Sequence, residues 1–192
     1  AFGRPDLPKN NSLSGGADGR SPVVGDKTAA MDKHFKDSET VDISFLIVGS
    51  TRTDNGSGVD QDIVTDHNTL VNHAISVAEH RKDCLVLASP RKASIVDVSS
   101  ESTQASNVEA DFANVTSSSY AVFDSGWVYQ YDRFNDKYVW VPGNGHTAGI
   151  MARSDLLQDP WYSPAGFSRG QYLGITKLAF NPKKAARDDL YR

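Results

Sequence analysis

The sequence predicts an α/β protein with a mixed, largely parallel sheet, flanking helices and an aromatic-rich β-hairpin. Two apolar runs of strand length, 41–49 and 84–88, enclose a stretch with helical spacing at about 59–82. Strand, helix and strand in that order form a βαβ unit, whose two strands run parallel. Two aromatic-rich runs, 127–131 and 138–141, flank a polar turn and therefore predict the hairpin.

Residues 1–25 are expected to form an extended lead-in to an α/β core domain at 26–192, because glycine and proline punctuate them. A glycine-dense turn at 13–19 invites comparison with a phosphate cradle. Such a cradle needs a following helix and usually a lysine, whereas Pro22 and two valines follow here, so a plain loop is expected. A short helix should then start at Asp26, whose side chain can cap it.

The first strand, 41–49, begins with alternating polarity and ends almost wholly apolar, which is typical of a strand buried on both faces. A polar loop at 50–58 leads into the long helix. That helix carries one apolar stripe, made of Ile63, Leu70, Val71, Ala74 and Ala78. The expected core packs Leu70, Val71 and Ala74 on strand residues Ile43, Phe45, Ile47, Leu85, Val86 and Leu87.

The second half of the chain continues with a helix within 101–115 and a third strand at 120–124, followed by the hairpin. A short helix at 145–153 and a last strand at 173–180 come next. Pro182 should open a charged helix that runs to the end of the chain, because proline is favoured in the first turn.

Composition and charge narrow the function. With 192 residues, 39% hydrophobic and 23% charged, the chain can build one substantial core. Its net charge of −4 argues against direct binding to nucleic acid, which normally requires a basic excess. No apolar run approaches the about 20 residues of a membrane span, so no membrane insertion is expected.

The sequence offers no strong sign of a metal or cofactor site. His73 and His80 lie two helical turns apart, about 10 Å, whereas helical metal ligands usually lie four residues apart. With His67 they are expected to lie on a solvated helix face. Cys84 is the one cysteine and sits in an apolar run, so we expect a small core residue rather than a nucleophile. We expect no cofactor and no metal.

A hydrolytic enzyme is the alternative that the residues leave open. Members of a Ser/His/Asp triad need not be adjacent in sequence. Candidates are Ser89 at a strand end, with His67 or His146, and Asp42 or Asp66. No Gly-x-Ser-x-Gly elbow supports any of them. We therefore expect no catalytic residues and no enzymatic activity.

The most informative segment is 160–170, which holds three aromatics, two glycines and two prolines in eleven residues. This composition excludes a regular helix or strand. Because three exposed rings would form an apolar patch, we expect a structured loop that packs against another domain or a neighbouring subunit. The candidate interface residues are Trp161, Tyr162, Pro164, Phe167 and Arg169.

This segment resembles the PW-x-SPAG-[YF]-x-RG segment of tail sheath proteins from contractile-tailed phages. Phe167 stands where the family has tyrosine or phenylalanine, and Ser154 replaces a threonine in another segment. The resemblance covers about residues 13–192. Further segments agree in the same order: 13–19 with LSGG-x-DG, 41–49 with the strand that follows, 81–90 with R-x-DCLVL-x-SP, 129–136 with YQYD-x-[YF]ND, 140–142 with WVP, 149–155 with AGL-x-ARTD, and 181–191 with a helix containing RD-x-LY.

The resemblance implies a structural subunit of a contractile tail sheath. Such subunits polymerise helically around the tail tube, and the sheath contracts to drive the tube through the host envelope for genome ejection. A related contractile injection machine is the alternative. The implied partners are other sheath subunits, the tail tube protein, and baseplate and tail terminator proteins. The implied location is the tail sheath of the virion, after synthesis in the host bacterial cytoplasm.

On the terminal helix, the candidate residues facing the tube or a neighbour are Lys183, Lys184 and Arg187. A solvated helix face is the other interpretation of these residues.

Sheath proteins of this family are longer at both ends. The chain lacks an initiator methionine and stops at Arg192, so we expect it to be the central part of a larger, multi-domain subunit. In the family, terminal arms add strands to neighbouring subunits. Without those arms, this piece alone is expected to stay mainly monomeric.

Overall fold

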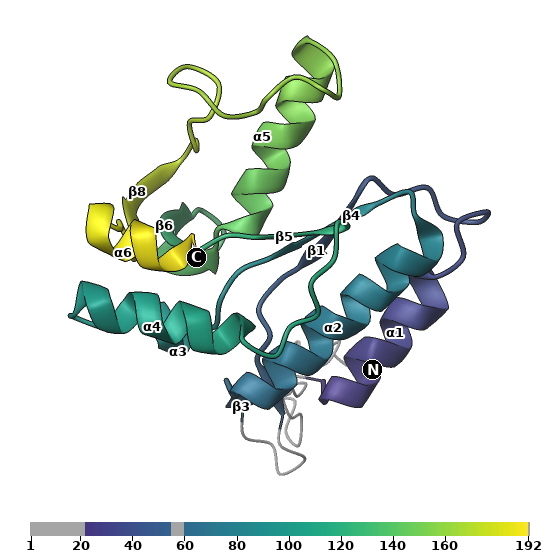
Figure 1. Ribbon diagram of the computed structural model, residues 1–192, viewed down its shortest axis with the longest axis horizontal. Coiled ribbons are helices and arrows are strands. Elements are labelled where there is room, and N and C mark those ends of the chain that lie inside the picture. Colours follow the sequence, from purple (N-terminus) through teal and green to yellow (C-terminus); the bar gives the residue numbers. More distant parts are fainter. Residues whose placement is uncertain (1–21, 55–59, 192) are drawn as a thin grey trace, which may run out of the picture.

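The structure is a computed structural model that describes residues 22–54 and 60–191 (Figure 1). Most of the expected lead-in, including the turn at 13–19, therefore lies outside the described residues. The helices are α1 Val24–Phe35, α2 Val64–Arg81, α3 Lys92–Ile95, α4 Glu101–Phe112, α5 Asn144–Leu157 and α6 Lys184–Leu190. The strands are β1 Phe45–Val48, β2 Thr53–Asp54, β3 Asp60–Gln61, β4 Leu85–Ala88, β5 Ala121–Phe123, β6 Trp127–Asp132, β7 Lys137–Pro142 and β8 Ile175–Leu178.

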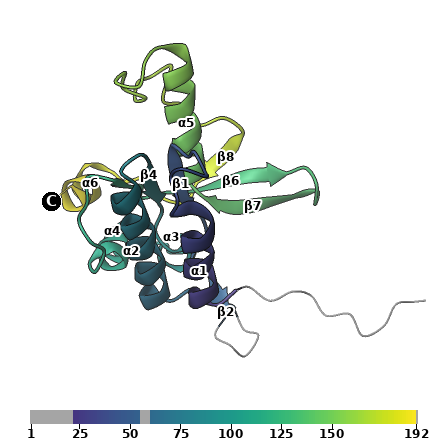
Figure 2. The same cartoon turned by 90° about the vertical axis from the view of Figure 1, so that its right-hand side faces the viewer.

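The predicted α/β class is confirmed. Strands β1, β4 and β5 form a parallel sheet in the order β1-β4-β5, with Leu46 opposite Val86 and Val86 opposite Ala121. Helix α2 is the crossover between β1 and β4, as the βαβ pattern predicted. The hairpin of β6 and β7 pairs with β8 in a second, antiparallel sheet. Figure 2 shows this hairpin extending away from the helices.

Only one face of strand β1 enters the core, so the expectation of burial on both faces is wrong. Leu46 and Val48 are buried, whereas Ile47 is 45% exposed and Phe45 is half-buried. Helix α2 covers the face that carries Leu46 and Val48. Because strand side chains alternate between faces, Phe45 and Ile47 cannot share that core, whereas Ile43, just before β1, is half-buried and packs against it. The expected burial of Leu70, Val71, Ala74, Val86 and Leu87 is confirmed, and Leu85 is only half-buried.

Several helix boundaries differ from the expectations. Helix α1 begins at Val24, and its N-cap Val23 makes no side-chain capping bond, so Asp26 lies in the first turn instead of capping. Helix α2 begins only at Val64, because β3 occupies the chain just before it. Ile63 is therefore an N-cap residue, 41% exposed, and does not belong to the buried stripe. Helix α5 has 14 residues and is longer than predicted.

Arg81 ties the segment between α1 and β1 to the end of α2. Its side chain is fully buried and pairs with Asp83 at 2.8 Å. The guanidinium also donates to the backbone carbonyls of Phe35 (2.7 Å), Asp37 (3.0 Å) and Val41 (2.7 Å). A buried guanidinium is stable only when its donors are paired, and here backbone and carboxylate oxygens supply the partners.

Candidate interaction surfaces

The aromatic segment forms a loop between α5 and β8 that is folded around Arg169. The Arg169 guanidinium lies 4.6 Å from the ring centre of Tyr162 and donates to the carbonyls of Ser163 (3.2 Å) and Ala165 (2.8 Å). Gly166 has φ of 142°, and a Cβ there would lie 3.1 Å from the guanidinium. Glycine is therefore required at this position for both its backbone angle and its small size.

The other two rings of this loop point outward. Trp161 is 80% exposed and Phe167 is 96% exposed. Leu156 and Leu157, at the end of α5, are also exposed, as is Leu173. The loop lies against the last turns of α5, because Tyr162 and Arg169 line a pocket together with Leu157. We call the exposed side chains Leu156, Leu157, Trp161 and Phe167 the apolar tip, whereas Leu173 lies beside the first half of α5. Figure 1 shows this end of α5 rising away from α1 and α2. Exposed apolar clusters of this kind mark contact sites between proteins.

The structure brings the predicted loop residues together but divides their roles. Tyr162 and Arg169 stack on each other inside the loop and are half-buried, as is Pro164. Trp161 and Phe167 make the outer surface. Composition predicted a loop pinned by aromatics, and it did not reveal that an arginine holds the loop while two of the rings face outward.

The predicted cationic residues lie on or next to α6. Lys183, Lys184 and Arg187 are all exposed. Lys183 approaches Glu101 of α4, with 3.7 Å between Nζ and Oε2, and its backbone N–H donates to the same carboxylate. Such an exposed pair contributes little stability. Arg187 and Lys184 remain available for contact with another molecule.

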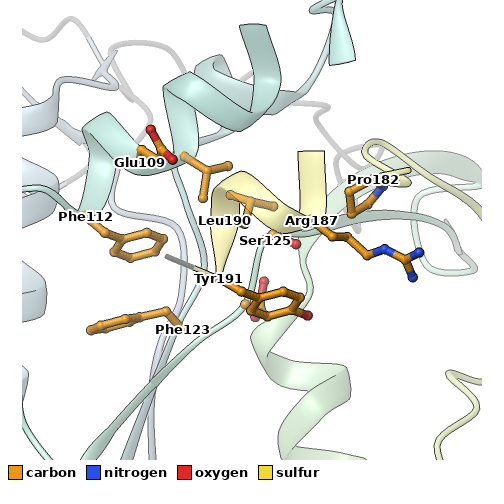
Figure 3. A pocket seen from close by; sticks show the side chains of 10 residues that line it. Glu109, Phe112, Phe123, Ser125, Pro182, Arg187, Leu190 and Tyr191 are labelled. Carbon is orange, nitrogen blue, oxygen red and sulfur yellow. The ribbon is translucent and has the colours of Figure 1, made fainter. Parts of the chain in front are cut away.

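A pocket of about 400 Å³ lies between α4, β5 and α6. Its walls are mainly apolar, and the rings of Phe112 and Phe123 stack there at 4.6 Å. Figure 3 shows Arg187 on the other side of the pocket from these rings. The lining residues are Val108, Glu109, Phe112, Phe123, Asp124, Ser125, Pro182, Arg187, Leu190 and Tyr191. They come from three separate parts of the sequence, and only Arg187 was among the predicted site residues.

Ser89, Asp124 and Asn144 meet where the parallel sheet joins the antiparallel one. The Ser89 hydroxyl donates to Asp124 Oδ2 at 2.8 Å, and the backbone N–H of Asn144 donates to Ser89 Oγ at 3.0 Å. Burial raises the pKa of the Asp124 carboxyl to about 6, while hydrogen bonds from Gly126 N–H and Ser89 oppose part of that rise. Sequence reasoning identified Ser89 but neither of its partners.

The residues considered for a catalytic triad are not assembled into one. His67 Nδ1 lies 3.1 Å from Thr51 Oγ1, and His146 Nε2 lies 3.0 Å from Gln130 Oε1. Asp66 accepts a hydrogen bond from Thr53. Ser89 is therefore bonded to a carboxylate and a backbone N–H, and neither histidine is among its partners in the described residues.

His67 is fully buried, so its expected place on a solvated helix face is wrong. Burial lowers the pKa of this imidazole, and the same cause lowers the pKa of His146. Cys84 is buried as expected, and burial raises the pKa of its thiol. Within residues 22–54 and 60–191, no cluster of three potential metal ligands occurs. None of the described helices is long and apolar enough to cross a membrane.

Comparison with known proteins decides the family. A family model described as phage tail sheath protein central domain matches residues 24–192. The chain belongs to the phage tail sheath protein family. Three similar relatives carry the name tail sheath protein. The sheath chain is 36% identical to the one from Enterobacteria phage T4 over 94% of its own length, and 35% identical to the one from Vibrio phage KVP40 over 82%. It is 34% identical to the one from Salmonella phage ViI over 62%.

The sheath chain spans only part of these relatives. It covers 28% of the T4 protein, 24% of the KVP40 protein and 18% of the ViI protein. Its fold is thus that of one portion of a larger structural protein of the virion.

Proposed function

We propose that this chain is the α/β core, residues 26–192, of a subunit that polymerises helically around a tail tube and contracts to drive the tube through the host envelope. A helical sheath requires one surface of each copy to meet a different surface of the next, without closing into a single ring. The observation that carries the proposal is the apolar tip, where Trp161 is 80% and Phe167 is 96% exposed on a loop that Arg169 holds in place.

The tip fits a contact between subunits better than a free surface. A ring in water gains nothing from exposure, whereas burial of one aromatic side chain against a neighbour removes about 150–250 Å² of surface from water. The loop that carries the rings is internally bonded, so it can dock without a large ordering cost. We infer that Trp161, Tyr162, Pro164, Phe167 and Arg169 form this interface, and that Lys183, Lys184 and Arg187 face the tube or a neighbour.

The remaining parts of the proposal follow from the family. The partners would be further sheath subunits, the tube protein, and baseplate and terminator proteins of the tail, in a virion whose proteins are made in the host cytoplasm. The subunit would act mechanically and not as an enzyme. Its relatives are named as tail sheath proteins, and Ser89 is occupied by structural hydrogen bonds.

The test is assembly of the complete subunit that contains this chain, observed by electron microscopy and sedimentation. The wild-type subunit should form regular tubes, and the Trp161→Ser, Phe167→Ser double variant should remain largely unassembled while keeping its circular dichroism spectrum. The matched control is Phe134→Ser, which removes a ring that is 86% exposed at the hairpin turn. Failure of the wild-type subunit to form tubes would refute the function; normal assembly of the double variant would refute the interface.

A further inference from the structure

Helix α5 is attached to the body by buried polar groups at its first turn. Asn144 opens the helix and is 1% exposed, and Ser89, which follows β4, is 4% exposed. Asp124 follows β5. We call these three residues the α5 joint. They come from the ends of three elements that are far apart in the sequence.

The α5 joint connects both sheets to the helix. The Asn144 side-chain amide donates to the carbonyls of Val48, at the end of β1, and Leu87, in β4. Ser89 bridges the Asn144 backbone N–H and the Asp124 carboxylate. Asp124 in turn accepts from the N–H of Gly126 at 2.9 Å, directly before β6. One set of hydrogen bonds thus joins β1, β4, β5, β6 and α5.

The backbone packs tightly at the same place. The N–H of Gly143 donates to the carbonyl of Gly126 at 3.0 Å. A Cβ on Gly143 would lie 3.1 Å from that carbonyl oxygen and 3.3 Å from Asp124 Oδ1. A side chain at Gly143 would therefore crowd the Gly126 carbonyl and the Asp124 carboxylate, so the entry into α5 is closely packed.

Helix α5 is long enough for its direction to matter. At 1.5 Å per residue, its 14 residues span about 21 Å between the joint and the apolar tip. A rotation of about 10° at the joint would move the far end by about 4 Å over this length. Among the described residues, the side-chain hydrogen bonds that join α5 to other elements come from its first four residues, such as Thr147 Oγ1 at 2.8 Å from the hydroxyl of Tyr172.

We propose that the α5 joint is a positioning site, which fixes the angle of α5 so that the apolar tip meets a neighbouring copy at one defined place. This rests on the proposed function as a sheath subunit. Apolar contacts at the base would tolerate sliding, whereas a buried polar network is satisfied in only one geometry and any shift leaves unpaired groups. Subunits that move as rigid bodies need such a fixed arm to transmit displacement from one copy to the next.

The experiment measures the angle directly in the complete subunit. Spin labels are placed at Leu156→Cys, on the tip, and Ser76→Cys, on the exposed side of α2; Cys84 is buried and does not compete. In the unmodified background the distance distribution should be narrow. Ser89→Ala leaves two polar groups of the joint without a partner, and it should widen the distribution about twofold. The matched control is Ser94→Ala, because Ser94 is equally buried but lies outside the joint.

If Ser89→Ala prevents folding, Asp124→Asn is the second variant, because it keeps the shape but offers one acceptor oxygen where Asp124 accepts from both the Ser89 hydroxyl and the Gly126 N–H. A distribution that widens in the joint variant but not in Ser94→Ala supports the proposal. An equally narrow distribution in the joint variant overturns it, even if the unfolding midpoint falls, because a merely stabilising role would not set the angle. Electron microscopy distinguishes the α5 joint proposal from the proposed function. If wild-type subunits form tubes and the joint variant leaves the angle of α5 unchanged, the α5 joint proposal fails and the proposed function stands.

Discussion

At the scale of single residues, buried polar groups hold distant parts of this chain together. Arg81 bonds to carbonyls 40, 44 and 46 positions away in the sequence, and Asn144 bonds to a carbonyl 96 positions away. Arg91 pairs with the fully buried Asp111 at 2.7 Å and so joins α3 to α4. Each group is costly to bury alone and stable only with its partner, so each is a point where one substitution should have a large effect.

Asp124 should give the chain a measurable pH dependence. Its pKa is raised from 3.8 in the unfolded chain to about 6 in the fold, so the folded state binds more protons between these values. Stability from this group is therefore present at low pH and is lost as pH rises from about 4 to 6, by roughly 2–3 kcal/mol. Asp124→Asn removes this contribution.

The measurement is urea unfolding of the 192-residue chain at pH 4, 5 and 7. The free energy of unfolding of the Asp124→Asn variant, relative to that of wild type, should increase as pH rises, because wild type loses stability and the amide does not titrate. Asp37 and Asp132, whose pKa values are lowered, act equally in both proteins and cancel in the difference. Parallel stability curves for the two proteins would contradict the assignment.

Arg81→Met should destabilise the chain strongly. The substitution keeps much of the side-chain volume but leaves three backbone carbonyls in the segment 35–41 without their donor, and the expected loss is about 3 kcal/mol. Chemical denaturation measures it. Arg153→Met is the matched control, because Arg153 is exposed on α5, and its effect should stay within about 0.5 kcal/mol. Similar effects of the two substitutions would show that Arg81 does not hold this segment.

At the scale of secondary-structure elements, hydrophobic periodicity predicted the helices and strands whose own sequence carries a strong pattern. The β1-α2-β4 unit, β5 and the hairpin were all found. The pattern could not say which face of β1 a helix would cover, because residues 45–48 are all apolar, and Ile47 was placed on the wrong side. The short elements α3, β2 and β3 were missed because four residues or two are too few to show a periodic pattern. The partners of Ser89 in the α5 joint were missed because they come from distant parts of the chain.

The aromatic loop should depend on the shape of the Arg169 side chain. Lysine can keep the charge but cannot stack a planar group on Tyr162 while donating to the carbonyls of Ser163 and Ala165. Arg169→Lys should therefore open the loop more often and raise its rate of chymotrypsin cleavage about threefold or more, with little change in the global unfolding midpoint.

Mass spectrometry of the fragments locates the cleavage between 160 and 170. Arg133→Lys is the matched control, because Arg133 also lies over a ring, that of Phe134, at 5.1 Å but in the hairpin turn. It should leave cleavage of the aromatic loop unchanged. Equal cleavage rates in Arg169→Lys and wild type would mean that Tyr162 and its neighbours hold the loop without the guanidinium.

At the scale of the whole molecule, a compact α/β body carries two projections, the hairpin and α5 with its loop (Figures 1 and 2). The ends of these projections carry strongly exposed rings, Phe134 on one and Trp161 and Phe167 on the other. The body accounts for the stability of the fold, and the projections reach beyond it. The exposed side chains Leu156, Leu157, Trp161 and Phe167 all belong to the α5 projection, so the proposed contact is assigned to α5, and Phe134 on the hairpin serves as its control.

The cationic helix gives the last prediction. Lys184 and Arg187 are exposed on α6, and neither forms an ion pair with another residue that the structure describes. If they face the tube or a neighbour, Lys184→Glu with Arg187→Glu should lower the fraction of tail tubes that acquire a sheath, and raised salt should lower the same fraction for wild type. Lys33→Glu with Lys137→Glu makes the same charge change on α1 and the hairpin and should leave assembly intact.

Sedimentation with and without tubes identifies the partner of α6. A defect confined to mixtures with tubes assigns α6 to the tube, and a defect in both assigns it to the neighbouring subunit. Normal assembly of the α6 variant under both conditions would show that this helix is only a solvated face.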